Sequence, residues 1–355
     1  MKIETGDAGI LCKKYYLVSD IGGTNTTIAL VGWQNDQFHI IVKAVFETQQ
    51  ITDFMIPFRQ AFAYFTENFQ YKIPESCCIC AAGPIDGNVC HLTNASWGVD
   101  GNKITAEFGL KTFVINDFTA LSYGIPVLNI DNEAEIVKMK DARGMTPVPE
   151  GPYKAVIGAG TGLGVGFTAT VNGKTIAFPS EGGHFDFPAF DDETTELMIF
   201  TRKRLGSHPD MECFVSGIGL SYIFDFLTEE KHPEPTPLRR EIKALPDSGR
   251  PPVIAANAMK DPVCAAAHRL FRKIYGKMAG NIASVLLPKG GLYIAGGVIS
   301  KDLKLFLSDT TFIDAFSVNY KNNISNLLKT IPIYIVRNYS TSLLGAANAA
   351  RNFEK

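Results

Sequence analysis

Hydrophobic residues in this chain fall into short runs that end abruptly in polar residues or glycines, a pattern typical of buried strands in α/β proteins. One run, 113–115, ends in Asn116 and Asp117, and residues 118–121 then start a predicted helix. Ligands of open α/β sheets bind at the carboxyl ends of the strands, which makes Asp117 a candidate catalytic base. Asp is also a common N-cap residue, and this stretch by itself favours the cap.

The same reading predicts alternating strands and helices along the whole chain. Strands are expected at residues 15–19, 26–33, 38–48, 76–82, 155–157, 175–178, 292–295 and 331–336. Helices are expected at residues 52–69, 100–108, 191–205, 261–287 and 342–353. Phenylalanines recur every three or four residues in the first helix, which indicates a stripe that faces the core. The stretch 231–252, rich in proline and charge, is predicted to be a surface excursion around one short helix without chemistry of its own.

Two glycine-rich turns follow predicted strands and are candidates for binding phosphate groups. The first, DIGGTN, runs from Asp20 to Asn25, and the second, GAGTGLG, occupies residues 158–164. Glycine lets backbone N–H groups approach a ligand without an intervening Cβ, and a carboxylate such as Asp20 suits Mg²⁺ or its waters. For the first turn the alternative is an ordinary Gly-Gly hairpin.

Two familiar nucleotide motifs do not fit the glycines. The dinucleotide fingerprint G-x-G-x-x-G fails because Leu163 stands where its third glycine belongs. A P-loop that would end at residues 173–175 fails because Thr168 takes the place of its first glycine. Asn172 and Gly173 instead predict a hairpin turn. The pattern therefore favours neither a nicotinamide enzyme nor a P-loop NTPase.

Polar residues on other loops are candidates for binding hydroxyl groups. Glu181 accepts hydrogen bonds and His184 can accept or donate them, a combination suited to neighbouring hydroxyls; a loop histidine satisfied by backbone or water is the alternative. Asn94 fits either a polar ligand or a structural turn, and Glu212 adds a carboxylate beside another turn. The glycine pair at 296–297 permits close approach of a flat group such as adenine, or forms a plain strand-to-helix turn.

Composition narrows the class of protein. The length of 355 residues suggests two domains. The 34 basic residues are balanced by 36 acidic ones, so the chain lacks the excess of positive charge that binding to nucleic acid requires. The N-terminus lacks the features of a secretory signal, and no apolar run is long enough to cross a membrane. Seven cysteines without a disulfide spacing are expected to be reduced thiols of a cytoplasmic protein. Those of the CCIC cluster at 77–80 are expected to be buried apolar residues rather than metal ligands.

The ordered motifs DIGGTN, LTNASW, FVINDFTA, GAGTGLGVG, EGGHFDF, FVSGIGL, IAGGVI and LLGAA resemble those of bacterial-type glucokinases, which belong to the hexokinase, Hsp70 and actin superfamily. The resemblance runs from about residue 16 to residue 352. The ROK branch of sugar kinases carries a Cys-rich zinc motif shortly after its Glu-x-x-His segment, and this sequence has none there. The resemblance is therefore to the branch outside ROK.

This resemblance implies a role for each candidate residue. Asp117 is the implied catalytic base. The residues implied to bind glucose are Asn94, Asn116, Asp117, Glu181, His184 and Glu212. Those implied to bind ATP are Gly22, Gly23, Thr24, Asn25, Gly158, Gly160, Thr161 and Gly162 at the phosphates, and Gly296 and Gly297 near the adenosine. Asp20 is implied to hold Mg²⁺, through water.

The implied fold is α/β, the two-domain actin-like ATPase fold (ribonuclease H-like), with a cleft for sugar and ATP between a small domain, 1–116 plus 341–355, and a large domain, 117–340. The implied activity is ATP-dependent phosphorylation of glucose at the 6-hydroxyl by a cytoplasmic enzyme that forms a homodimer. Two alternatives stay open on the same fold, a non-catalytic sugar sensor and an ATPase like actin or Hsp70.

Overall fold

The computed structural model describes residues 1–69, 72–92, 95–141, 143–301 and 303–354, which form two compact units. Unit 1 comprises Met1–Asn129, Thr168–Pro179 and Asn338–Lys355, and unit 2 comprises Ile130–Phe167 and Ser180–Arg337. Unit 1 therefore includes residues 117–129 and 168–179, which the predicted boundaries gave to the large domain.

Packing of the C-terminal helix α13 (Thr341–Phe353) accounts for this difference. Asn348 Nδ2 of α13 donates to the carbonyl oxygen of Tyr123 at 2.9 Å, and the rings of Phe353 and Tyr123 meet edge to face. Asn352 Oδ1 accepts the backbone N–H of Thr175 at 3.0 Å. These buried contacts hold both the segment after Asp117 and the 168–179 hairpin in the same unit as α13.

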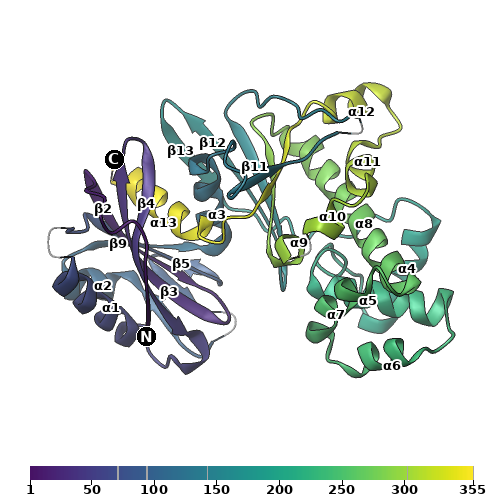
Figure 1. Ribbon diagram of the computed structural model, residues 1–355, viewed down its shortest axis with the longest axis horizontal. Helices are drawn as coiled ribbons and strands as arrows, with labels where there is room; N and C mark the ends of the chain where they lie inside the picture. Colours follow the sequence, from purple (N-terminus) through teal and green to yellow (C-terminus); the bar gives the residue numbers. More distant parts are fainter. Residues whose placement is uncertain (70–71, 93–94, 142, 302, 355) are drawn as a thin grey trace. The chain divides into compact units, whose positions relative to one another are not determined.

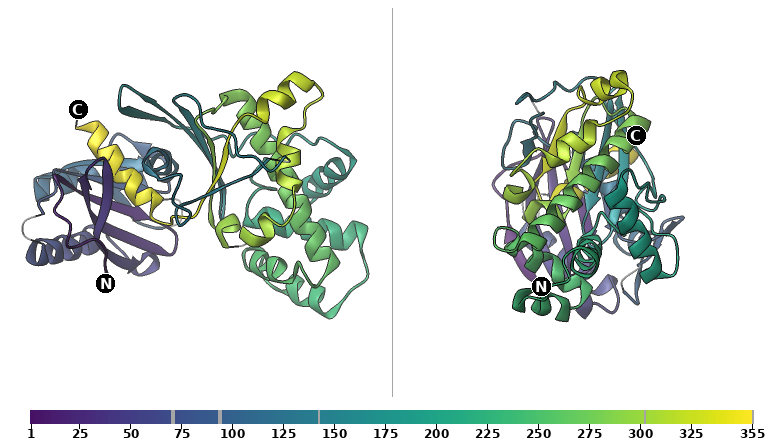
Figure 2. Two further views of the ribbon diagram at one scale, coloured as in Figure 1. Left: turned by 45° about the horizontal axis from the view of Figure 1, so that its top comes forward. Right: turned by 90° about the vertical axis from the view of Figure 1, so that its right-hand side faces the viewer.

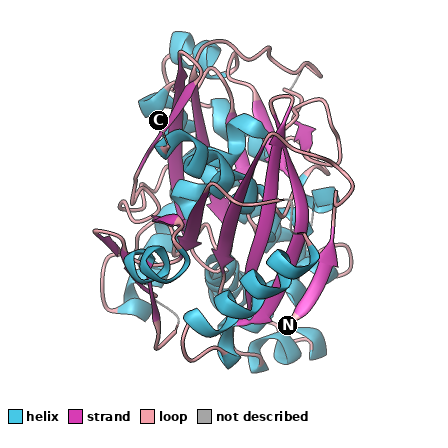
Figure 3. Cartoon of the chain, turned by 90° about the vertical axis from the view of Figure 1, so that its left-hand side faces the viewer, coloured by secondary structure: helices cyan, strands magenta, loops and turns pink. Residues whose placement is uncertain are grey.

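Unit 1 is built on a six-stranded sheet with the order β1-β4-β3-β2-β5-β9, whose strands run side by side in Figure 3. The strands are β1 (Lys2–Thr5), β2 (Lys14–Ile21), β3 (Asn25–Gln34), β4 (Gln37–Glu47), β5 (Ser76–Ala81) and β9 (Lys111–Asn116). The helices are η1 (Thr48–Gln50), α1 (Met55–Asn68), α2 (Gly101–Phe108), α3 (Asp117–Gly124), η2 (Ile125–Val127) and α13. In Figure 1, α1 and α2 cover one face of the sheet and α3 and α13 the other.

Residue placement in unit 1 confirms two predictions about its core. Phe54, Phe58 and Phe65 of the predicted stripe are buried. The cysteines at 77–80 are buried in strand β5, between β2 and β9, as expected of small apolar residues. A short sheet of β6 (Ile85–Asp86), β7 (Val89–His91) and β8 (Gly98–Asp100) was not predicted, because each strand has only two or three residues.

A second six-stranded sheet has the order β10-β15-β14-β11-β12-β13. Its strands are β10 (Ile136–Lys138), β11 (Tyr153–Ala159), β12 (Leu163–Val171), β13 (Lys174–Phe178), β14 (Leu292–Ala295) and β15 (Ile333–Val336). The helices of unit 2 are α4 (Asp192–Leu205), α5 (Gly217–Phe226), η3 (Leu227–Lys231), α6 (Pro237–Ala244), η4 (Asp247–Gly249), α7 (Arg250–Asn257), α8 (Pro262–Leu286), α9 (Gly297–Lys301), α10 (Leu303–Phe306), α11 (Thr311–Ser317) and α12 (Asn322–Leu328). The long helix α8 packs along α11 and lies against α5 and α7 (Figures 1 and 2). Among the described helices, none is long and apolar enough to cross a membrane.

The two sheets repeat one strand order. When the strands of each repeat are numbered one to five along the chain, both sheets have the spatial order three, two, one, four, five. These strands are β4-β3-β2-β5-β9 in the first sheet and β13-β12-β11-β14-β15 in the second. In each repeat the turn between the first and second strands carries one of the predicted glycine loops. The two glycine loops thus occupy equivalent positions in the two repeats, a relation that appears in the sequence only as two weakly similar glycine runs.

Residues 231–252 lie mostly at the surface of unit 2, as predicted, but they contain η4 and the start of α7 besides the one predicted short helix, α6, and buried side chains anchor them to the core. Ile242 is fully buried, and Arg239 and Arg250 are at least nine-tenths buried. Arg250 binds Asp225 through two contacts of 3.2 and 3.0 Å. A buried carboxylate therefore anchors this charged, proline-rich stretch.

Candidate active site

Three parallel strands of unit 1 bring the predicted base and the predicted metal ligand to one edge of the sheet. In the register of β2, β5 and β9, Asp20 lies opposite Cys80, and Ala81 lies opposite Asn116. Asp117 follows Asn116 directly. The carboxyl ends of adjacent parallel strands form the ligand crevice in this class of sheet. Asp20, Asn116 and Asp117, which are far apart in the sequence, thus share one edge.

Asn116, not Asp117, caps helix α3. Its Oδ1 accepts the backbone N–H groups of Phe118 at 2.9 Å and Thr119 at 3.3 Å. Asp117 is the first helical residue, and its Oδ1 also accepts the N–H of Phe118, at 2.9 Å. Since Asn116 supplies the N-cap, the capping role weighed for Asp117 is filled by its neighbour. The side-chain NH₂ group of Asn116 is the part of the amide that the cap does not use.

Asp20 is held close to a second carboxylate. Burial, together with the smaller effect of the charge of Asp117, raises the pKa of Asp20 to about 6. The thiol of Cys80 lies 3.7 Å from Asp20 Oδ1, and burial raises the pKa of that thiol well above its ordinary value. Two carboxylates close together beside an uncharged thiol produce a negative electrostatic potential, which favours a bound cation.

The first glycine loop is a hairpin turn between β2 and β3, and its carbonyl groups are turned to one side. The carbonyl of Gly22 accepts from Thr48 Oγ1 at 2.7 Å, and that of Gly23 accepts from Gln49 Nε2 at 3.1 Å. A trans peptide directs its N–H group opposite to its carbonyl. The N–H groups of Gly23 and Thr24 consequently point away from Thr48 and Gln49, as donors to phosphoryl oxygens would. Thr48 and Gln49 carried no signal in the sequence that links them to this loop.

The second glycine loop lies between β11 and β12 in unit 2 and is connected to Glu212. The backbone N–H of Leu163, near the end of the loop and the first residue of β12, donates to Glu212 Oε2 at 2.8 Å. The carbonyl oxygen of Gly160 accepts the N–H of Gly217, the first residue of α5, at 2.9 Å. The carboxylate predicted to bind sugar thus also holds the end of the predicted phosphate loop.

Glu181, His184 and Glu212 come together in unit 2. The backbone N–H of Glu212 donates to the carbonyl oxygen of Gly183 at 3.2 Å, and that of His184 donates to the carbonyl of Glu181 at 3.0 Å. Gly183 cannot carry a side chain here, because a Cβ would lie 1.9 Å from the carbonyl oxygen of Leu163. The close approach of these backbones explains why a glycine stands before His184.

Asp210 is a member of this cluster that the sequence did not single out. Its Oδ2 lies 2.9 Å from Nδ1 of His184. The hydrogen bond to Asp210 raises the pKa of His184 above its ordinary value, although burial opposes the shift. Nothing in the sequence marks Asp210 as a partner of His184, since 26 residues separate the two and the contact depends on the fold.

Gly296 directly follows β14 and has a positive φ of 101°, and a Cβ at this position would lie 2.1 Å from the carbonyl oxygen of Ala159. The glycine is therefore required by the close packing of β14 on β11. Gly297 begins α9. Both residues lie in unit 2, as does the second glycine loop. Their position near the adenosine stays a prediction. Asn94, predicted to lie near glucose, falls outside the described residues.

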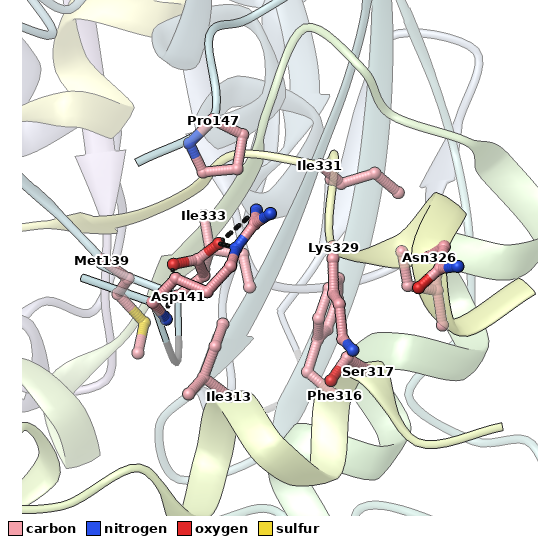
Figure 4. Close-up of a pocket in the computed structure, with 12 residues that line it drawn as sticks. Met139, Asp141, Pro147, Ile313, Phe316, Ser317, Asn326, Lys329, Ile331 and Ile333 are labelled. Atoms are coloured by element: carbon pink, nitrogen blue, oxygen red, sulfur yellow. Dashed lines mark hydrogen bonds and ion pairs between the residues drawn. The ribbon is translucent and has the colours of Figure 1, made fainter. Parts of the chain in front are cut away.

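A cavity of about 180 Å³ in unit 2 is separate from these groups (Figure 4). Apolar side chains that include Met139, Ile313 and Phe316 line it, together with Arg143, which is paired with Asp141. Among the described residues, none of the predicted site residues lines it.

A family model described as Glucokinase matches residues 17–353. The chain belongs to the glucokinase family. It is 35% identical over 349 residues to a glucokinase of Nostoc punctiforme, with 94% of this chain and 98% of the relative covered. It is 34% identical over 337 residues to that of Pectobacterium atrosepticum, with 94% and 95% covered. Family membership makes the chain a sugar kinase, a phosphotransferase that acts on an alcohol group.

Solved structures confirm the predicted actin-like ATPase fold. A glucokinase from an Antarctic psychrotroph superposes with a TM-score of 0.78 at 27% identity, over 96% of this chain and 99% of that one. A ROK family glucokinase from Streptomyces griseus, in complex with glucose and AMPPNP, has a TM-score of 0.60 at 19% identity, over 95% of this chain and 99% of that one, and shows the shared fold.

Proposed function

We propose that this protein transfers the γ-phosphoryl group of ATP to the 6-hydroxyl of glucose, with Asp117 as the general base. The observation that carries the proposal is the position of Asp117 directly after a buried parallel strand, with its helix capped by Asn116. Similarity to relatives named glucokinase supports glucose as the acceptor. The complex of the Streptomyces griseus protein with glucose and AMPPNP, on the same fold, supports an adenine nucleotide as the donor.

The chemistry is a single in-line displacement. The glucose 6-hydroxyl attacks the γ-phosphorus, Asp117 accepts the hydroxyl proton, and ADP leaves. Backbone N–H groups of the two glycine loops stabilise the charge on the phosphoryl oxygens. Asn116 donates through its side-chain NH₂ to a sugar hydroxyl, while Glu181 and Glu212 accept from others. Glycines 296 and 297 are proposed to lie near the adenosine.

Asp20 is proposed to hold Mg²⁺ through water. The residues fit this cation, because Mg²⁺ is usually bound by one or two carboxylates, phosphates and several waters rather than by a cage of protein ligands. Among the described residues, no group of three or more His, Cys, Asp or Glu side chains forms such a cage. When bound, Mg²⁺ supplies positive charge to the phosphoryl oxygens.

One coupled assay decides between the kinase and the two alternatives. With glucose, Mg²⁺ and ATP present, we expect release of ADP that depends on glucose and equals the glucose 6-phosphate formed. ADP release that is independent of glucose would indicate an ATPase like actin or Hsp70. Binding of glucose without any ADP release would indicate a sugar sensor.

His184→Ala is expected to raise KM for glucose about tenfold and to leave KM for ATP unchanged, because the imidazole is proposed to contact only the sugar. Steady-state kinetics with each substrate varied in turn measures both constants. An unchanged KM for glucose would show that His184 is structural.

Glu212→Ala, in contrast, is expected to raise KM for both substrates. Its carboxylate is proposed to accept from a sugar hydroxyl, and its Oε2 accepts the backbone N–H of Leu163 near the end of the second glycine loop. Loss of a hydrogen bond to a charged group weakens glucose binding by about 10- to 100-fold, and a smaller rise is expected for ATP. His184→Ala is the matched control, and a Glu212→Ala variant that alters only the glucose constant would show that the loop does not depend on this carboxylate.

The cytoplasm and a homodimer are part of the same proposal. The free cysteines support a reducing compartment, and five of the seven, Cys77, Cys78, Cys80, Cys90 and Cys264, are buried. The dimer rests on the family resemblance, and light scattering of the purified protein tests it: a molar mass of one chain would exclude a stable dimer.

A further inference from the structure

We propose that Asp210 is a positioning residue that fixes the tautomer of His184, so that Nε2 of the imidazole accepts a hydrogen bond from a sugar hydroxyl. The inference deepens the proposed function and rests on it for the identity of the ligand. It concerns which ring nitrogen of His184 bears the hydrogen, a property that the sugar-binding role alone leaves undecided.

The backbone holds Asp210 and His184 in place. Asp186 and Asp210 form an antiparallel bridge, and the N–H of Met211 donates to the carbonyl of Phe185 at 3.0 Å. These bonds tie the segment that carries His184 to the segment that carries Asp210. The 2.9 Å contact between Nδ1 and Oδ2 is thus fixed by backbone pairing on both sides.

Both oxygens of Asp210 have assigned partners. Oδ1 accepts the backbone N–H of Cys213 at 3.2 Å, and Oδ2 faces His184 Nδ1. Hydrogen bonds from His184 and Cys213 lower the pKa of Asp210 against the opposing effect of burial. An ionised carboxylate only accepts hydrogen bonds. The hydrogen of the neutral imidazole therefore lies on Nδ1, and Nε2 is left with its lone pair.

The charged groups that act on His184 are all carboxylates. Asp210, Glu212 and Glu181 each favour the protonated ring. As the pH falls through the raised pKa of His184, Nε2 gains a hydrogen and changes from acceptor to donor. Glucose affinity should consequently fall with decreasing pH in the wild-type protein.

The variant Asp210→Asn reverses the tautomer without removing either hydrogen bond. Because the side-chain oxygen still accepts from Cys213, the NH₂ group replaces Oδ2 and donates to Nδ1. Nε2 then carries a hydrogen in the neutral ring as well as in the protonated ring. We expect glucose affinity to be about tenfold weaker at neutral pH and nearly independent of pH.

The test is calorimetric titration of glucose without nucleotide between about pH 5.5 and 8.5, which spans the histidine range. Wild-type affinity should fall toward acid, and Asp210→Asn should match the acid limb of the wild type throughout. NMR of the ring nitrogens, with His184 assigned from its absence in His184→Gln, should show hydrogen on Nδ1 in the wild type and on Nε2 in Asp210→Asn. A wild-type pH profile in Asp210→Asn, or hydrogen on Nε2 in the wild-type neutral ring, would overturn the inference.

Asp186→Asn is the matched control, because this exposed carboxylate sits on the same paired segments and makes no contact with the imidazole. It should leave the glucose affinity and its pH profile unchanged. The NMR signature requires no substrate. If the proposed function were wrong, the protein would not phosphorylate glucose, but NMR would still show the hydrogen of the neutral wild-type ring on Nδ1. The two failures can therefore be distinguished.

Discussion

Asp117→Asn is expected to lower kcat for glucose phosphorylation by about 10² to 10⁴-fold, the usual contribution of a general base. The substitution keeps an oxygen that can accept the N–H of Phe118, as Oδ1 does at 2.9 Å. The helix retains its N-cap at Asn116. We therefore expect the fold and glucose binding to persist, since only the capacity to take a proton is lost. Steady-state kinetics and calorimetric titration of glucose measure the two effects.

Asp100→Asn is a matched control for this prediction. Asp100 also stands at the start of a helix, where its Oδ1 accepts the N–H groups of Asn102 and Lys103. Asn is as good an N-cap as Asp, so this variant should retain the wild-type kcat. Wild-type turnover in Asp117→Asn would limit Asp117 to a structural role at the start of α3.

Asp225→Ala is expected to lower the free energy of unfolding by about 3–5 kcal/mol, as breaking a buried ion pair does. The Asp225 side chain is only 1% exposed and contacts two arginines, Arg250 at 3.0 Å and Arg204 at 2.6 Å. Removal of the carboxylate leaves the buried guanidinium of Arg250 with only the partly exposed Asp247 as a counter-charge, at 3.0 Å, and loosens the 231–252 segment. Urea unfolding followed by circular dichroism measures the loss.

Glu229→Ala provides the comparison in the same region. Glu229 pairs with Lys243 at 2.7 Å, but both side chains are about two-fifths exposed. Such surface pairs contribute at most about 1 kcal/mol. If the two alanine variants were equally stable, the buried cluster would not anchor the segment.

The sequence located the positions at which chemistry is proposed, because these positions are encoded locally. An apolar run that stops at Asn116 and Asp117 marks the end of a strand whatever lies beside it, and a Gly-Gly turn at 22–23 marks a hairpin. Both features require only a few consecutive residues. The ordered motifs then gave the family, which the comparisons confirmed over residues 17–353.

Several structural roles were decided by contacts between distant residues. The N-cap of α3 is Asn116 rather than Asp117, because an N-cap is defined by backbone angles that the residue types do not specify. Residues 117–129 belong to unit 1, and not to the large domain that was predicted to contain them, because α13 packs on α3. The 231–252 segment was tied into unit 2 by Asp225, which precedes it in the chain.

The sequence by itself determined the class of fold, the family and the candidate residues, because strand ends, glycine turns and motif order are local properties of the chain. Only the tertiary structure decided which of these residues are neighbours. Strand register brings Asp20 to the same sheet edge as Asn116. Hydrogen bonds connect the first glycine loop to Thr48, Leu163 to Glu212, and His184 to Asp210. The physical reason is that these contacts, and the strand register that brings Asp20 and Asn116 to one sheet edge, relate residues 26 to 96 positions apart. Sheet register and packing, rather than local preference, fix such pairs.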